Sequence, residues 1–143
     1  SNLPEANKFF RMALKFNPGF SPALTMLGNN LKRMGNAGEA EKMLRAAIRS
    51  WPMNKHAYDS LAHVLATLNK RTEAIKMLKK AINIDPNYGV GHANLAMIYS
   101  SLNNNNKSLE HLNQAIQLGV QGPVIDRIKS IVTQKADQES RND

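Results

Sequence analysis

The residues best suited to chemistry in this 143-residue sequence are two histidines and an aspartate. His56, Asp59 and His63 are spaced so that they would share one face of a helix, and two imidazoles with a carboxylate can bind zinc. Only Asp59 and His63 have the i, i+4 spacing of adjacent ligands, and an aspartate and a histidine in that arrangement are more typical of a hydrogen-bonding surface. We therefore predict no metal site.

No other group of residues indicates catalysis. The sequence contains no cysteine, which excludes disulfides, thiol catalysis and cysteine-ligated zinc. It has no phosphate-binding glycine loop, no nucleophile elbow and no paired carboxylates, so we predict neither a catalytic residue nor a cofactor. Asn106-Lys107-Ser108 matches the N-glycosylation sequon, which matters only in a lumenal protein.

The composition favours helices. Apolar residues make up 42% of the chain but aromatic residues only 6%, and Leu, Ala, Met and Ile carry most of the apolar content. Alanine and unbranched side chains lose little rotamer freedom in a helix, which predicts an all-α fold. No apolar run approaches the roughly 20 residues that a membrane-spanning helix needs.

An internal repeat of 34 residues organises the helices. Proline recurs at 18, 52 and 86, and several columns of small or apolar residues keep the same step. These columns are Ala6, Ala40, Ala74 and Ser108; Ala13, Ala47, Ala81 and Ala115; and Leu27, Leu61 and Leu95, each followed by a small residue. Small residues let antiparallel helices approach closely, and the proline cannot continue the helix before it. The repeat therefore predicts a series of two-helix units.

The boundaries of these helices follow from the same columns. We expect helices at about 4–16, 21–34, 38–51, 55–68, 72–84, 89–102 and 106–118, and an eighth from Pro123 to Lys135. Gly35, Asn69 and Asn103 stand at the turns within the units, where a left-handed conformation is expected. Lys129 and Ser130 replace the Leu-small pair in the last helix, which suits a terminal capping helix.

Two helices in 34 residues, with these Leu-small, Ala, Leu, Ala and Pro spacings, resemble the tetratricopeptide repeat. The resemblance implies an α-solenoid of antiparallel helix pairs in a right-handed superhelix. It assigns the second helix of a truncated repeat to 1–20, complete repeats to 21–54, 55–88 and 89–122, a capping helix to 123–136, and a polar tail to 137–143. We expect the chain to be the C-terminal part of a longer array.

The first helix lacks its partner in this reading. Its apolar side chains, Phe9, Phe10, Leu14 and Phe16, are therefore expected to be poorly covered. We predict that this end either frays or self-associates.

In the tetratricopeptide family the first helix of each repeat lines a concave groove, where partners usually bind. The resemblance implies a groove built from side chains that avoid the apolar packing columns. We expect its residues to be Thr25, Met26, Asn29, Arg33, His56, Asp59, Ser60, His63, Asn94, Met97 and Ser101, with Ala93 beside them.

Two ligand-binding modes known in the family do not fit these columns. A clamp for the C-terminal carboxylate of chaperones needs lysines and an arginine, whereas the corresponding positions include Asn29, Ser60 and Asn94 and no cation. The asparagine ladder of O-linked N-acetylglucosamine transferase needs one asparagine per repeat, whereas this column reads Met26, Ser60, Asn94.

The net charge of +8 is concentrated on the second helices. We expect a convex basic stripe formed by Lys8, Arg11, Lys15, Lys42, Arg45, Arg49, Lys76 and Lys79. Such a stripe could contact phosphates, acidic lipid or an acidic protein. Lysine and arginine are also ordinary on exposed helix faces, and no aromatic residues interleave for base stacking, which argues against nucleic acid as the partner.

These observations predict a non-catalytic scaffold that binds a peptide or helix of another protein in the groove. Two alternatives stay open: an accessory array of a larger enzyme, such as an O-mannosyltransferase-like or O-GlcNAc-transferase-like glycosyltransferase, and a basic adaptor that binds nucleic acid or acidic membrane. The compartment also stays open. The absence of cysteine fits the cytoplasm, and the endoplasmic reticulum lumen would suit a membrane-anchored parent.

Overall fold

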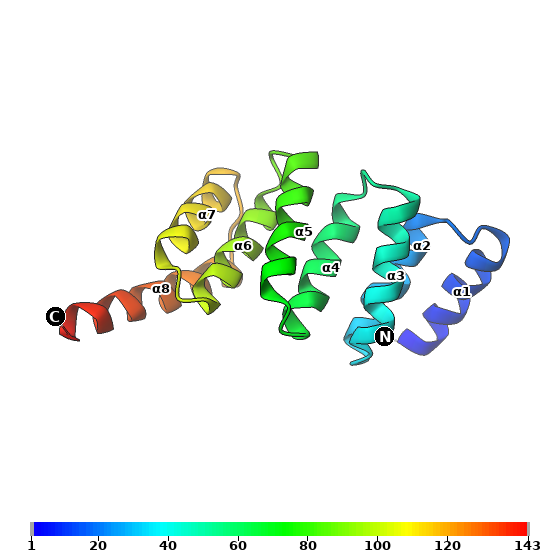
Figure 1. Ribbon diagram of the computed structural model, residues 1–143, viewed down its shortest axis with the longest axis horizontal. Coiled ribbons are helices and arrows are strands. Elements are labelled where there is room, and N and C mark those ends of the chain that lie inside the picture. The colour runs from blue at the N-terminus through cyan, green and yellow to red at the C-terminus, as the bar shows by residue number, and fades with distance from the viewer. Residues whose placement is uncertain (1, 143) are drawn as a thin grey trace. The chain divides into compact units, whose positions relative to one another are not determined.

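The computed structural model describes the backbone of residues 2–142 and the side chains of residues 2–134. Every regular element in that part of the chain is an α-helix, which confirms the all-α prediction (Figure 1). The helices are α1 (Leu3–Phe16), α2 (Ser21–Arg33), α3 (Ala37–Ser50), α4 (Lys55–Thr67), α5 (Arg71–Ile84), α6 (Gly89–Ser101), α7 (Asn105–Gln117) and α8 (Pro123–Asn142). None of the helices, over its described residues, is long and apolar enough to cross a membrane.

Local sequence explains where the helices begin and end. The side chains of Asn36 and Asn104 accept hydrogen bonds from backbone N–H groups in the first turns of α3 and α7. Gly35, Asn69 and Asn103 have positive φ angles of 80°, 62° and 57°, as predicted for the turns that follow α2, α4 and α6.

The last helix is longer than expected. The sequence predicts an end near Lys135 and a polar tail at 137–143, whereas α8 continues to Asn142. No glycine or proline follows Pro123, and Lys, Gln, Glu, Ala and Arg are good helix formers, so the sequence contains no signal that would end the helix earlier.

The chain divides into two compact units, Ser1–Ile84 and Asp85–Asp143. In the first, α2 pairs with α3 and α4 with α5, while α1 packs on α2 and α3 packs on α4. The alanine columns of this unit are fully buried, with Ala40, Ala47, Ala74 and Ala81 each 0% exposed. Gly28 shows how close the helices lie, because a Cβ atom there would come within 2.7 Å of the Cγ atom of Leu44.

The second unit consists of the α6–α7 pair with α8 packed against both helices. Its core combines Ala93, Ala96, Leu112 and Ala115 with three residues of α8, namely Ile125, Ile128 and Val132. Ser108 takes the place of an alanine and is fully buried, because its hydroxyl donates a 2.8 Å hydrogen bond to the Ala96 carbonyl.

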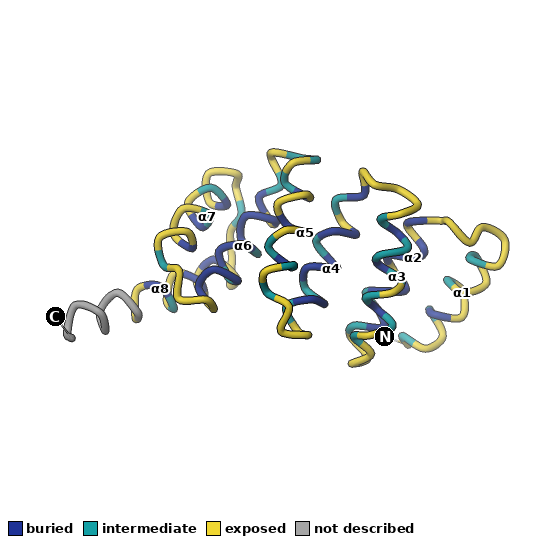
Figure 2. The backbone as a smooth tube through the Cα atoms, viewed as in Figure 1, coloured by how far each residue is buried: buried dark blue, intermediate teal, exposed yellow. Residues whose placement is uncertain are grey.

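The first helix is covered on one side only. Figure 2 shows α1 exposed along most of its length, in contrast to the buried stretches of α2 and α4. Phe9 and Phe16 are 62% and 85% exposed, whereas Phe10 and Leu14 are half-buried. The expected exposure is therefore confirmed for Phe9 and Phe16, whereas Phe10 and Leu14 are partly covered.

Candidate functional site

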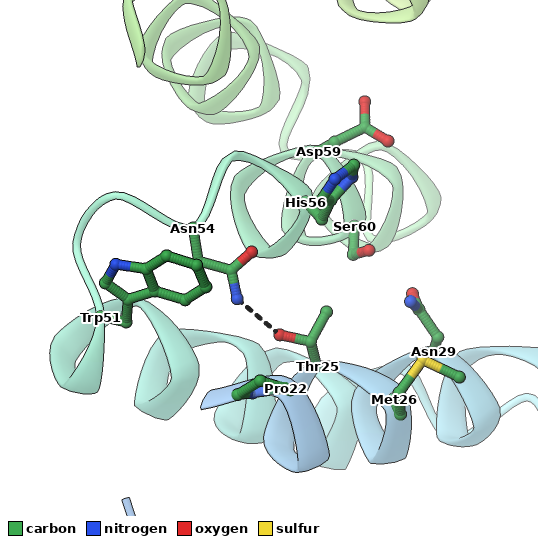
Figure 3. Close-up of a pocket in the computed structure, with 9 residues that line it drawn as sticks. All are labelled: Pro22, Thr25, Met26, Asn29, Trp51, Asn54, His56, Asp59 and Ser60. Atoms are coloured by element: carbon green, nitrogen blue, oxygen red, sulfur yellow. Dashed lines mark hydrogen bonds between the residues drawn. The ribbon is translucent and has the colours of Figure 1, made fainter. Parts of the chain in front are cut away.

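A cavity of about 480 Å³ lies in the first unit, where α2 faces α4 (Figure 3). Its walls come from these two helices and from the loop between α3 and α4. The lining residues are Pro22, Thr25, Met26, Asn29, Trp51, Asn54, His56, Asp59 and Ser60. Six of them belong to the eleven predicted groove residues, so the structure brings just over half of that set to one place.

A buried hydrogen-bond network forms the floor of this cavity. The Asn54 side chain caps α4 by accepting a 3.1 Å hydrogen bond from the Ala57 N–H. Its Nδ2 group donates to the hydroxyls of Ser21 at 2.9 Å and Thr25 at 3.1 Å. Ser21 and Thr25 in turn donate to the carbonyls of Ala47 and Ser21, each at 2.9 Å. The network therefore ties α2, α3 and α4 together at the base of the cavity.

Two predicted groove residues are less accessible than expected. Thr25 is 6% exposed and Ser60 is 7% exposed, whereas the sequence analysis treated both as side chains outside the core. For Thr25 the reason is structural, since its hydroxyl belongs to the network. Asn54 was missed altogether, although an asparagine directly before a predicted helix is a typical N-cap and could have indicated it.

Ser60 differs from Thr25 in its hydrogen bonding. No described residue forms a hydrogen bond with the Ser60 hydroxyl, which points into the cavity from α4. The half-buried amide of Asn29 faces it from α2 and likewise has no hydrogen-bond partner among the described side chains. The hydrogen-bonding capacity of these two side chains is therefore directed at the cavity.

The exposed part of the wall is largely apolar. Met26 is 48% exposed and Trp51 is 50% exposed, with Pro22 beside them. The ionisable lining residues are His56 and Asp59, and no Lys or Arg among the described residues lines the cavity. In a chain with a net charge of +8, this is a locally non-basic site.

The histidines and the aspartate that opened the sequence analysis do not assemble into a metal site. Asp59 Oδ2 lies 3.9 Å from His63 Nδ1, and His56 lines the cavity. Over residues 2–134, no three His, Asp or Glu side chains are arranged to hold a metal ion.

The remaining predicted groove residues lie elsewhere. Arg33 and His63 belong to α2 and α4 but do not line the cavity. In the second unit Asn94 is half-buried, and the exposed Ser101 donates a 2.7 Å hydrogen bond to the Ile98 carbonyl.

The prediction that Ala93 and Met97 of α6 lie in the groove, outside the core, is wrong. Ala93 is 2% exposed and belongs to the core of the second unit, and Met97 packs against that core. The reason is α8, whose apolar side chains pack against the same core.

The convex basic stripe contains cations that are already paired. The Nη2 atom of Arg11 lies 2.6 Å from the Oε1 atom of Glu39. The Nη2 atom of Arg45 lies 2.6 Å from Oε1 of Glu73 and 2.8 Å from Oε1 of Glu41. Two of these acids, Glu39 and Glu73, stand 28 residues after their arginines, so the prediction of the stripe from the cations alone missed the pairing. Lys8, Lys42, Lys76 and Lys79 are exposed.

Glu41 illustrates the electrostatics of this face. Partial burial by itself raises the pKa of its carboxyl, but hydrogen bonds from Arg45 and Lys70 outweigh that effect and hold the pKa below its usual value. The carboxylate therefore stays charged and neutralises part of the stripe.

A histidine pair in the second unit was missed from the sequence. The Nδ1 atoms of His92 and His111 lie 3.0 Å apart, and the His111 ring stacks on Tyr99 with 5.6 Å between ring centroids. Burial lowers the pKa of His92 below its usual value, and the nearby His111 lowers it further, against a small opposing effect of Glu110. His92 stands one repeat after Tyr58, which is also buried, so the repeat indicates the burial of His92 but not its partner.

The sequence repeat is matched by two family models, both described as tetratricopeptide repeat. One covers residues 56–88 and 91–118, and the other covers residues 23–51. Among curated proteins, none has a sequence that matches this chain.

The fold is similar to several solved structures. A crystal structure of MamA aligns with a TM-score of 0.76 and 17% identity, covering 98% of this chain and 92% of that one. The crystal structure of YrrB, described as a TPR protein with an unusual peptide-binding site, aligns with a TM-score of 0.78 and 23% identity, covering 90% of this chain and 66% of that one. Another crystal structure of MamA aligns with a TM-score of 0.73 and 21% identity, covering 82% of this chain and 64% of that one. At these identities the similarity establishes the fold alone.

Proposed function

Because the chain belongs to the tetratricopeptide repeat family, we propose that it binds a peptide or helix of a partner protein in the cavity between α2 and α4 and catalyses nothing itself. Its fold is that of a protein-interaction scaffold. The observation that carries the proposal is the cavity itself, in which the side chains of Asn29 and Ser60 direct unused hydrogen-bonding groups between exposed apolar walls.

The rigidity of the floor supports binding at this place. The Asn54 network fixes α2 and α4 through hydrogen bonds that are already made without a ligand. A partner segment therefore meets a preorganised surface, and the entropy cost of binding falls mainly on the segment. The similarity to YrrB adds support, since that protein is described as having a peptide-binding site.

A second candidate function uses the convex basic stripe as an adaptor for polyanions. Exposed lysines such as Lys42, Lys76 and Lys79 favour it. The ion pairs of Arg11 and Arg45 count against it, because a polyanion would have to compete with the carboxylates of Glu39 and Glu73. An accessory array within a larger enzyme would use the cavity to choose a substrate, so this alternative agrees with the proposal on the binding site.

Paired variants separate the cavity from the stripe. Peptides selected from a displayed random library against the full chain serve as ligands, and their affinities are measured by calorimetry. We expect Asn29→Ala with Asp59→Ala to abolish binding with almost no change in Tm. The control, Lys42→Glu with Lys76→Glu and Lys79→Glu, should change affinity little; it leaves Arg45 and its ion pairs intact.

The opposite result would contradict the proposal. If the charge reversal removes binding and the cavity pair does not, the ligand lies on the stripe. Binding through the stripe would also weaken steeply as salt is added, because it would be mainly electrostatic.

A further inference from the structure

If the proposed function is right, the residues that line the cavity also indicate which kind of side chain it binds. Ser60 is 7% exposed, and no described residue forms a hydrogen bond with its hydroxyl. Because this hydroxyl opens onto the cavity, a ligand that covers it without supplying a hydrogen bond would leave it buried and unpartnered, which costs free energy.

The other polar groups of the floor are already engaged. Both hydrogens of the Asn54 Nδ2 group are donated, to Ser21 and Thr25, and the Thr25 hydroxyl donates to the Ser21 carbonyl. Besides the ionisable His56 and Asp59, the uncharged side chains that can make new hydrogen bonds with a ligand are Ser60 and Asn29, which face one another across the cavity (Figure 3). A phenolic hydroxyl, which donates one hydrogen bond and can also accept, is satisfied by these two side chains alone.

The charge of the lining residues argues against an anionic ligand group. The lining has no Lys or Arg among the described residues, and it includes the carboxylate of Asp59. A carboxylate or phosphate entering the cavity would lose hydration without meeting a cation and would be repelled by Asp59.

The walls favour an aromatic ring. Met26 and Trp51 each present about half of their surface to the outside, at 48% and 50% exposure. Thioether sulfur and indole rings both make favourable contacts with aromatic side chains. The volume of about 480 Å³ is within the range of cavities that hold small molecules, so it has room for a ring.

We propose that the cavity recognises a tyrosine side chain of the partner segment, with its ring against Met26 and Trp51 and its hydroxyl hydrogen-bonded to Ser60 and Asn29. A site built to hydrogen-bond a hydroxyl discriminates against the analogue that lacks it, because its own buried polar group is then left without a partner. Phenylalanine is therefore the weaker ligand. Phosphorylation of the tyrosine excludes it from the cavity.

Three small molecules test this proposal on the full chain: p-cresol for tyrosine, toluene for phenylalanine and p-tolyl phosphate for phosphotyrosine. The chain contains a single tryptophan, Trp51, so its one indole N–H signal in a ¹H–¹⁵N NMR spectrum reports directly on the cavity. We expect p-cresol to shift this signal and to bind roughly three- to tenfold more tightly than toluene, the usual effect of one neutral hydrogen bond. p-Tolyl phosphate should leave the signal unchanged.

Ser60→Ala provides the decisive variant. It removes no hydrogen bond of the fold, so Tm should stay nearly unchanged, while the preference for p-cresol over toluene should shrink, because only the hydrogen bond to Asn29 remains. Ser101→Ala is the matched control, because that hydroxyl is exposed on α6 and lies outside the cavity. Its p-cresol affinity should equal that of the unaltered chain.

Equal affinities for p-cresol and toluene, an unaltered preference in Ser60→Ala, or tighter binding of p-tolyl phosphate would each overturn the tyrosine proposal. If any of these occurs while selected peptides still lose binding on Asn29→Ala with Asp59→Ala, only the side-chain preference is wrong. If the selected peptides also ignore the cavity variants, the proposed function itself is wrong.

Discussion

Asn7 and Asn30 form a buried polar contact between α1 and α2 that the later repeats do not reproduce. Each is 6% exposed, and Asn30 Nδ2 donates a 2.9 Å hydrogen bond to Asn7 Oδ1. Asn7 in turn donates to the Met34 sulfur at 3.4 Å. Val64 stands one repeat after Asn30, and Glu41 and Ile75 stand one and two repeats after Asn7, so no later repeat pairs two asparagines here. The amide pair therefore distinguishes the α1–α2 contact from the equivalent contacts further along the chain.

A double-mutant cycle measures what this pair contributes. Asn30→Val alone should destabilise the fold by about 1–3 kcal/mol, because it leaves the Asn7 oxygen buried without its donor. Asn7→Ile combined with Asn30→Val should recover most of that loss, since both polar groups are then gone. Urea unfolding of the single and double variants checks this. Strictly additive losses would show that the two amides do not depend on one another.

The contact between His92 and His111 predicts a pH-dependent stability. The folded state lowers the pKa of His92 from its usual 6.5, so the unfolded chain takes up a proton at a higher pH than the folded chain does. Stability should therefore be complete above pH 6.5 and should fall as the pH drops below that value. Replacing His92 with Phe should flatten this dependence.

Urea unfolding followed from about pH 8 to about pH 5 tests the histidine prediction. His63→Gln is a suitable control, because His63 is 44% exposed and lies outside this contact. A decline of equal size in His92→Phe would show that other groups cause the pH dependence. The carboxyl of Glu41 would not account for it, because its lowered pKa places its effect at more acidic pH.

The residues that the sequence could and could not predict differ in kind. Ala47 and Ala81 belong to columns that repeat, and a repeated small residue has one physical explanation, the close approach of two helices. The burial of Ser60 and the capping role of Asn54 depend instead on contacts specific to one repeat, so periodicity gave no signal for them. The pairing of Arg45 with Glu73 spans 28 residues, and aligning the acids in the same register as the bases would have revealed it.

At the scale of the elements, helix boundaries were predictable because proline, glycine and asparagine act locally. Left-handed backbone at Asn69 and Asn103 is an example, since asparagine tolerates that conformation better than most residues do. The prediction that α6 contributes Ala93 to the groove failed because exposure depends on a distant helix and not on local residues. Whether Ala93 is exposed depends on where α8 packs, and the sequence of α6 contains no information about that.

The spacing between paired helices can be tested by overpacking. Ala81 on α5 is 0% exposed, so Ala81→Leu should force the α4–α5 pair apart and cost about 1–3 kcal/mol of unfolding free energy. Asn83→Leu adds a leucine to the exposed side of the same helix and should change stability little. Chemical denaturation of both variants gives the comparison. An unchanged Tm for Ala81→Leu would mean that the repeat register is wrong.

Over the molecule as a whole, charge and apolar surface indicate different kinds of association. The net charge of +8 favours contacts with anions that salt weakens. Among the described residues, the most exposed large apolar side chain is Phe16, at 85%. It lies on α1 with Phe9 and Met12, which are 62% and 49% exposed, and the three share one face of the helix at i, i+3 and i+7.

This apolar face of α1 leads us to expect self-association. Exposed apolar patches commonly mark interaction sites, and burying large side chains in a contact between two copies removes them from water. The sedimentation coefficient should therefore rise with protein concentration and should not fall when salt is added, unlike association through the basic stripe. Phe9→Glu with Phe16→Glu should keep the chain monomeric, whereas Lys8→Ala with Lys15→Ala, on the same helix, should not. A chain that stays monomeric at every accessible concentration, with slow hydrogen exchange in α1, would show that α1 is stable without a partner.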